Sequence, residues 1–137
     1  MTAVEAGALL DGLQRESALY RSLIEVSGEE LRLVKAAELE QATVLLTRKQ
    51  GVLEEIAVIE KGVKPLKERW SAIRATLPPD TQAKFSGVLK DLSDLLERLI
   101  AIERETEEVL SGQITLVKKA RPMPGAEERA KKAYGSK

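Results

Sequence analysis

The sequence contains no cysteine and no histidine. It therefore lacks the common zinc ligands, and it has no side chain that titrates near neutral pH unless a pKa is shifted. The nine glycines are dispersed, and none belongs to a phosphate-binding loop that follows a strand. We expect no catalytic site, no metal and no cofactor, and we predict that the chain is not an enzyme.

Aromatic residues and long apolar runs are also scarce. Aromatics make up 3% of the chain, against 32% charged and 43% hydrophobic residues. This balance is typical of long amphipathic helices with narrow seams of Leu, Ile, Val and Ala. Apolar runs such as residues 99–102 are far shorter than the roughly 20 residues of a membrane-crossing helix, and the first residues do not resemble a secretion signal. We expect a cytoplasmic protein that does not insert into a membrane.

The net charge is zero, but the charges are unevenly distributed. Residues 1–117 carry 15 basic and 20 acidic residues, and residues 118–137 carry 7 basic and 2 acidic residues. A basic tail can displace counterions from phosphate, but Tyr134 is the only aromatic residue there that could stack on a base. We therefore favour a solvated end of the chain and expect no nucleic-acid partner.

The first periodic segment has the alternating steps of three and four residues that form a helix seam. Its seam positions are Leu10, Leu13, Ser17, Tyr20, Ile24, Ser27, Leu31 and Val34. Two interpretations compete at Ser27, which could cap a new helix with Glu30 at the capping-box position. The unbroken seam favours one helix over residues 4–35, in which Gly28 costs about 1 kcal/mol relative to alanine.

A second helix is predicted over residues 38–77. Pro65 lies inside it and removes a backbone donor, so we expect a bend near residues 62–65. Trp70 follows this bend on the seam and is expected to fill the core there. Two prolines at residues 78 and 79 then end the helix, because the residue before a proline avoids the helical conformation.

The third helix is predicted over residues 80–118, with Asp80 as its cap. Its apolar stripe is wider than a two-helix contact needs, which implies contact with two neighbours or with a partner outside the chain. Together the segments predict an all-α fold, an elongated antiparallel bundle of three long helices, with a flexible basic tail over residues 119–137.

The order of these features resembles the flagellar type III export chaperones of the FlgN type. The likeness covers about residues 8–75. It begins with Leu-rich heptads that contain a tyrosine followed by paired aliphatic residues, here Leu10, Leu13, Glu16, Tyr20, Leu23 and Ile24. It continues through Ala36, Ala37, Glu38, Leu39 and Glu40 and then Arg48, Lys49, Gln50, Val52 and Leu53. The resemblance places the first turn near residues 35–38, in agreement with the unbroken first seam.

The resemblance implies a cytosolic chaperone that binds the C-terminal amphipathic segments of hook-associated, or hook–filament junction, proteins before export. The wide stripe of the third helix is the predicted cargo-binding site, with Leu89, Leu96, Ile100, Leu110, Ile114 and Val117. The resemblance also implies that Tyr134 and Gly135 dock on the cytosolic domain of the export-gate membrane protein. The alternative is a structural or regulatory coiled-coil adaptor that uses the same heptads to associate with itself, which a persistent dimer would favour; a weak homodimer is also compatible with the chaperone.

Overall fold

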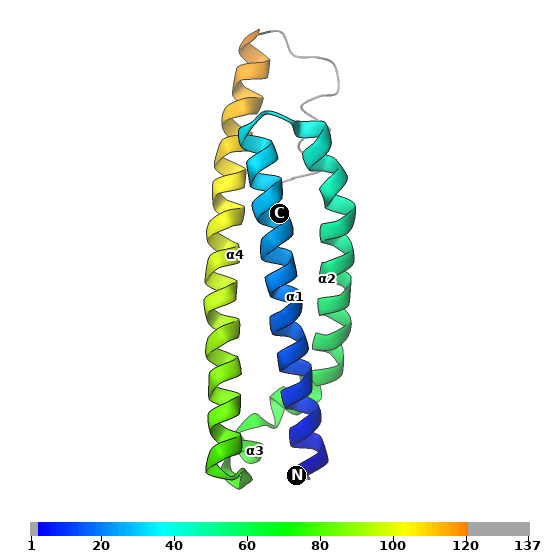
Figure 1. Cartoon of the computed structure of the whole chain (residues 1–137), viewed down its shortest axis with the longest axis vertical. Helices are drawn as coiled ribbons and strands as arrows, with labels where there is room; N and C mark the ends of the chain where they lie inside the picture. Colours follow the sequence, from blue (N-terminus) through cyan, green and yellow to red (C-terminus); the bar gives the residue numbers. More distant parts are fainter. Residues whose placement is uncertain (1–2, 121–137) are drawn as a thin grey trace.

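The computed structural model describes residues 3–120 of the chain, with the side chains of residues 3–113. These residues form four helices, α1 (Ala3–Lys35), α2 (Leu39–Glu68), α3 (Trp70–Thr76) and α4 (Pro79–Ala120), and the described part contains no strand. The three long helices lie along one axis, with α1 between α2 and α4 and with successive long helices running in opposite directions (Figure 1). The predicted all-α bundle is confirmed.

Helix α1 is continuous through the Ser27 position, as the unbroken seam predicts. Ser27 is fully buried, and its hydroxyl donates a hydrogen bond to Glu103 of α4 at 2.8 Å instead of capping a new helix. Glu30 is also buried and faces a lysine of α2, so it does not act in a capping box. The local capping pattern is therefore overridden by contacts with the other helices.

The turn after α1 has the hydrogen bonds of a Schellman motif. The Glu38 amide donates to the Leu33 carbonyl at 2.9 Å, and the Ala37 amide donates to the Val34 carbonyl at 3.0 Å. Ala37 has φ 59°, a left-handed conformation that usually favours glycine. The first turn thus lies at the predicted place but has an alanine where a glycine would be less strained.

The second predicted helix is divided into α2 and α3, with the interruption at Arg69 rather than at residues 62–65. Pro65 lies inside α2, which continues for three more residues to Glu68. Arg69 leaves the helical conformation, with φ −100° and ψ 9°, and its amide donates to Leu66. The short helix α3 then leads the chain across the end of the bundle towards α4 (Figure 1).

Helix α4 begins at Pro79, one residue before the predicted cap. Asp80 is therefore part of the first turn and not the capping residue. A proline suits the first helical position because its missing N–H has no partner there and its φ is already helical. The Gln82 side chain donates to the Leu77 carbonyl at 2.8 Å, which satisfies the end of α3 beside the start of α4.

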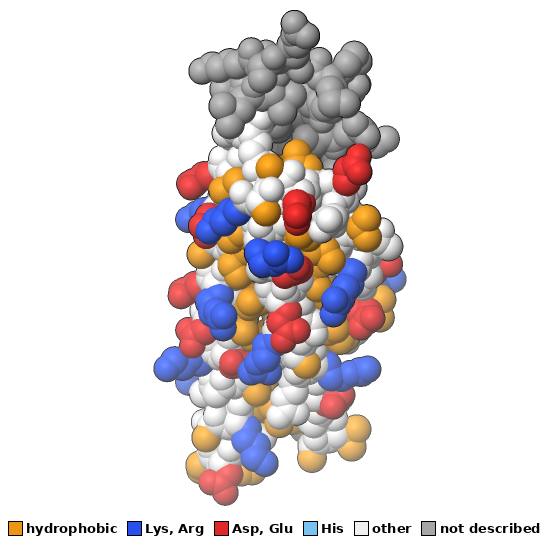
Figure 2. All heavy atoms as spheres, turned by 45° about the horizontal axis from the view of Figure 1, so that its top comes forward, with side chains coloured by type: hydrophobic (Ala, Val, Ile, Leu, Met, Phe, Trp, Pro, Cys, Tyr) orange, Lys and Arg blue, Asp and Glu red, His pale blue; other side chains and the backbone are white. Residues whose placement is uncertain are grey.

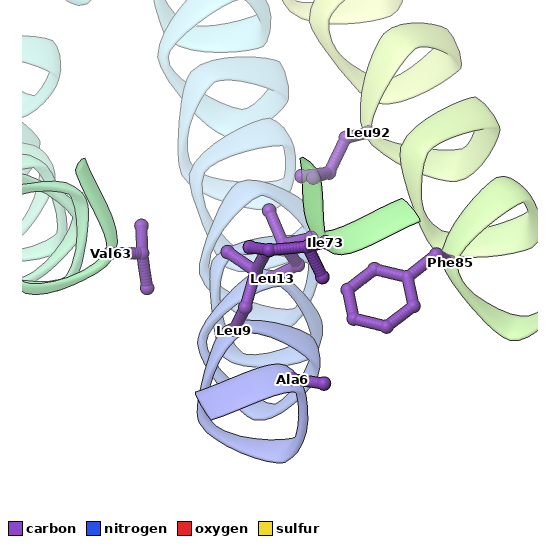
Figure 3. Close-up of a cluster of buried hydrophobic side chains, with 7 residues drawn as sticks. All are labelled: Ala6, Leu9, Leu13, Val63, Ile73, Phe85 and Leu92. Carbon is purple, nitrogen blue, oxygen red and sulfur yellow. The ribbon is translucent and has the colours of Figure 1, made fainter. Parts of the chain in front are cut away.

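The core at the α3 end of the bundle brings all four helices together (Figure 3). Its buried members are Ala6, Leu9, Leu13, Val63, Ile73, Phe85 and Leu92. Trp70 packs on this cluster, with its ring centroid 4.8 Å from that of Phe85 and the two planes tilted by 41°. A second cluster at the other end contains Leu33, Val34, Ala42 and Leu110.

Candidate protein-binding surface

Helix α1 packs along both α2 and α4, whereas the backbones of α2 and α4 stay largely apart. Long side chains join them, as shown by the Lys49 ammonium group, which lies 2.6 Å from the Glu103 carboxylate across the gap. The bundle is therefore tightly packed where α1 meets α2 and α4, and it is loosely packed between α2 and α4. This region is where a further helix would complete the bundle.

Apolar side chains border the gap between α2 and α4. Leu89, Leu96 and Glu103 are spaced by seven residues on α4, so the two leucines lie on the side of α4 from which Glu103 reaches α2. Leu89, Leu96 and Ile100 are 40%, 39% and 48% exposed. On α2, Leu53 lies one turn beyond Lys49 and is 39% exposed.

We call these four residues, Leu53, Leu89, Leu96 and Ile100, the open seam. Because α2 and α4 run in opposite directions, Leu53 lies four residues from the Lys49–Glu103 contact at about the level of Ile100. On the face that Figure 2 shows, apolar side chains are interspersed with charged ones along the bundle. Partly exposed leucines and isoleucines that line up along helices indicate a surface that can bind another amphipathic segment.

A socket lies at the α3 end of the open seam. Its volume is about 120 Å³, and its lining is almost entirely apolar. The residues that line it are Leu9, Leu13, Lys67, Trp70, Phe85 and Leu89. Because it is comparable to the roughly 150 Å³ cavity in which a benzene molecule fits, the socket has the size for one aliphatic side chain.

A polar network crosses the middle of the bundle beneath the open seam. Lys49 of α2 lies 3.0 Å from Glu30 of α1 and 2.6 Å from Glu103 of α4, and Glu103 also accepts the hydrogen bond from Ser27. Glu30 is 1% exposed, and its Oε2 has no hydrogen-bond partner in the described part of the chain. The fold tolerates a carboxylate as deeply buried as that of Glu30 only because an opposite charge lies close to it.

A second, weaker polar contact lies nearer the socket. Glu16 of α1 is 3% exposed, and its carboxylate lies 3.5 Å from the Lys67 ammonium group. On the same side of α1, the Tyr20 hydroxyl donates to Glu60 of α2 at 3.3 Å. Of these four groups only Glu16 is buried, so the contact with Lys67 gives a buried carboxylate its counter-charge, and the Tyr20–Glu60 hydrogen bond lies at the surface beside it.

Burial changes the proton affinity of these groups. It raises the pKa of the Glu30 and Glu16 carboxyls above 4.5, and in each case the nearby lysine only partly opposes the rise. Burial lowers the pKa of Lys49, but the hydrogen bond with Glu103 and the attraction of both carboxylates outweigh it, so the pKa is raised. Burial, together with the charge of Glu60, raises the pKa of Tyr20 to about 12.

The structure brings three of the predicted cargo-binding residues, Leu89, Leu96 and Ile100, together at the open seam. Leu110 is an exception, since it is only 4% exposed and packs with Leu33 and Val34 inside the bundle. It therefore belongs to the internal core. A helix surface turns by about 20° over each heptad, which carries Leu110 from the open flank towards α1.

The remaining predicted residues lie partly or wholly outside the described structure. Ile114 and Val117 lie in α4, but only their backbone is described. Tyr134 and Gly135 lie outside the described residues. The sequence interpretation missed Leu53, Glu16 and Glu30 as groups that surround the seam. The spacing of Leu9, Glu16, Leu23 and Glu30 at seven residues is a second seam on α1, and it could have indicated the two buried carboxylates.

Within residues 3–120, no group of three or more acidic residues is placed to hold a metal ion. None of the described helices combines the length and the apolar character that crossing a membrane requires. Protein-family models, curated proteins and solved structures were compared with the chain, and none of them matches it.

Proposed function

We propose that this chain is a cytosolic export chaperone that binds amphipathic helical segments of hook–filament junction proteins, keeps them soluble and unassembled, and delivers them to the flagellar export gate. Two lines support the proposal. The sequence over about residues 8–75 resembles the FlgN-type chaperones, and the bundle has an apolar seam that is not covered by its own described helices. Neither a metal nor a cofactor is part of this function.

The observation that carries the proposal is the exposure of Leu89, Leu96 and Ile100 on one flank of α4, opposite Leu53 of α2. A client helix laid on the open seam would cover these side chains, each contributing on the order of 1 kcal/mol from the part still exposed. Part of this gain is offset by the loss of freedom on binding, so the affinity is expected to be moderate. Moderate affinity suits a chaperone that has to release its client.

Capture is tested by co-purification with the C-terminal segments of hook–filament junction proteins. The variant Leu96→Asp places a charge in the open seam at a position that is already 39% exposed, so the fold should survive. Val58→Asp is the matched control, because Val58 is 72% exposed and its spacing of two residues from the buried Ile56 places it on the opposite side of α2. We expect Leu96→Asp to abolish capture and Val58→Asp to spare it. Equal capture by both variants would contradict the proposal.

Delivery is assigned in this proposal to Tyr134 and Gly135, in the tail beyond the described residues. A Tyr134→Ala chain should capture its client normally and should deliver less of it for export. Secretion of the junction proteins, measured beside co-purification from the cytosol, separates the two steps. Unchanged secretion with Tyr134→Ala would remove the docking role and leave the capture role intact.

Self-association is the second candidate. It is favoured by two further apolar residues, Val44 and Val58, which are 73% and 72% exposed and lie 14 residues apart on one face of α2. A dimer through this face would require no client. The mass of the chain in solution distinguishes the two candidates. A persistent dimer that Val58→Asp dissociates would support the adaptor and not the chaperone.

A further inference from the structure

The wall of α2 beside the socket is rich in lysine. A shallow depression along α2 is lined by Ala57, Glu60, Lys61, Lys64 and Lys67. Lys67 lines both this depression and the socket, so the two lie next to each other. We call Lys61, Lys64 and Lys67 the lysine edge.

The charges of the lysine edge are only partly compensated. Lys67 has one distant partner, the Glu16 carboxylate at 3.5 Å. Lys61 and Lys64 form no ion pair with any residue of the described part of the chain. Glu60, the one acidic residue of the depression, lies one turn before Lys64 and also accepts the hydrogen bond from Tyr20, so three lysines face one carboxylate and the depression keeps a net positive charge.

Helix α4 does not supply the missing negative charge. Because Lys49 faces Glu103 and the two helices are antiparallel, Lys61 and Lys64 lie at about the level of residues 88–91 of α4. Asp91 is the acidic residue at this level, and it pairs with Arg21 of α1 at 2.6 Å on the other side of α4. Towards the lysine edge α4 presents Leu89 instead, which also lines the socket.

From this arrangement we propose that the α3 end of the open seam selects client helices that carry a bulky aliphatic anchor and, about one turn away on one flank, acidic residues. The anchor enters the socket, and the acidic residues face Lys61 and Lys64. This inference rests on the proposed chaperone function and specifies which amphipathic helices the open seam prefers. Complementary charge at the edge of an apolar groove sets the orientation and the choice of partner more than the total affinity.

The charge also decides against the chain's own tail as the occupant. Residues 118–137 carry 7 basic and 2 acidic residues, so they would be repelled by the lysine edge. A helix of another protein with an acidic flank has the complementary charge. The apolar part of such a helix covers Leu89 and Leu96, and its carboxylates remain at the solvated border where lysine side chains reach most easily.

The test uses two fluorescent 18-residue synthetic helices with the same leucine seam, one with glutamates and one with lysines along the flank. Wild-type chain, Lys61→Glu/Lys64→Glu and the control Lys84→Glu/Lys90→Glu are titrated against each, after circular dichroism confirms the helical fold. The control makes the same change in net charge at two exposed lysines of α4. We expect wild type and the control to bind the glutamate helix about five- to tenfold more tightly than the lysine helix. The Lys61→Glu/Lys64→Glu variant should instead bind the lysine helix more tightly than the glutamate helix.

The socket is tested by replacing the central leucine of the glutamate helix with alanine, which should weaken binding by at least about tenfold. Equal binding of the two helices, a preference that survives Lys61→Glu/Lys64→Glu, or no binding of either helix would each overturn the inference. So would a dimer of the chain that Leu89→Asp dissociates, because a second copy would then occupy the seam.

The two proposals fail separately. If junction-protein segments bind but the lysine substitutions do not change their affinity, the chaperone function stands and the charge selection is wrong. If the glutamate helix binds in a lysine-dependent way and the junction-protein segments do not bind, the groove selects acidic helices of other proteins and the proposed function is wrong.

Discussion

Replacing Gly12 with alanine tests the closest approach of α1 to α2. A methyl group at Gly12 would overlap with the Cγ1 methyl of Val63, and it would also lie 3.7 Å from the Val63 Cβ and 3.9 Å from the Ile59 Cγ2. Valine has one strongly preferred side-chain rotamer in a helix, so its methyl group cannot simply rotate away. The two helices would therefore have to separate locally.

Two opposing terms decide how much Gly12→Ala changes the free energy of unfolding. Alanine is better than glycine inside a helix by about 1 kcal/mol, and forcing an extra methyl group into a packed contact costs roughly 1–3 kcal/mol. Gly28 lies in the same helix, and a methyl group there meets no other atom within 4 Å. Gly28→Ala should therefore stabilise the chain by about 1 kcal/mol. Since both substitutions gain the same helix propensity, the difference between them isolates the cost of overlap, about 1–3 kcal/mol.

Urea unfolding followed by circular dichroism at 222 nm measures both variants, with thermal midpoints as a check at roughly 4 °C per kcal/mol. Val63→Ala in the Gly12→Ala background should relieve the overlap, so the two substitutions together should cost less than the sum of their separate effects. If Gly12→Ala raises the unfolding free energy as much as Gly28→Ala does, the close approach of α1 and α2 at this position is wrong.

Three further predictions concern the first turn and the buried charges. Ala37→Gly should raise the free energy of unfolding by about 1 kcal/mol because the residue has φ 59°, and an unchanged urea midpoint would argue against the left-handed turn. Lys49→Met should lower it by about 3 kcal/mol because it leaves Glu30, 1% exposed, without its counter-charge, and a variant as stable as wild type would show that the pair is not buried. Burial raises the pKa of Glu30, so its stabilising contribution is present at pH values below the unfolded value of 4.5 and is lost as the pH rises through the folded value. The stability of Glu30→Gln relative to wild type should therefore increase from about pH 4 to about pH 7 in urea titrations, and a difference that is constant over this range would refute the shift.

The open seam shows how far the helical pattern leads and where it stops. The stripe of α4 predicts that Leu89, Leu96, Ile100 and Leu110 share one broad face, and the structure keeps the first three together and turns Leu110 into the core. The pattern does not say which part of the face is covered by α1. Three of these residues are 39–48% exposed, whereas Leu110 is 4% exposed. Exposure depends on the rotation of α4 about its axis and on how far α2 lies from it.

The buried carboxylates show a second limit. Ser27 and Glu30 form a local capping pattern, and a single sequence cannot weigh this pattern against contacts with distant segments. Glu30 contacts Lys49, which is 19 residues further along the chain, and Ser27 contacts Glu103, which is 76 residues further along. They are also the contacts that hold α2 and α4 in register where their backbones stay apart.

What the sequence determined by itself is the set of long helices, the turn at residues 35–38 and the stop at Pro78, because these follow from hydrophobic spacing and from backbone restrictions that act over a few residues. The tertiary structure decided the interruption at Arg69, the overlap at Gly12 and the open gap between α2 and α4. These features arise from distances between segments that are far apart along the chain. Periodicity fixes the side of a helix on which a residue lies, but only packing determines what that side meets.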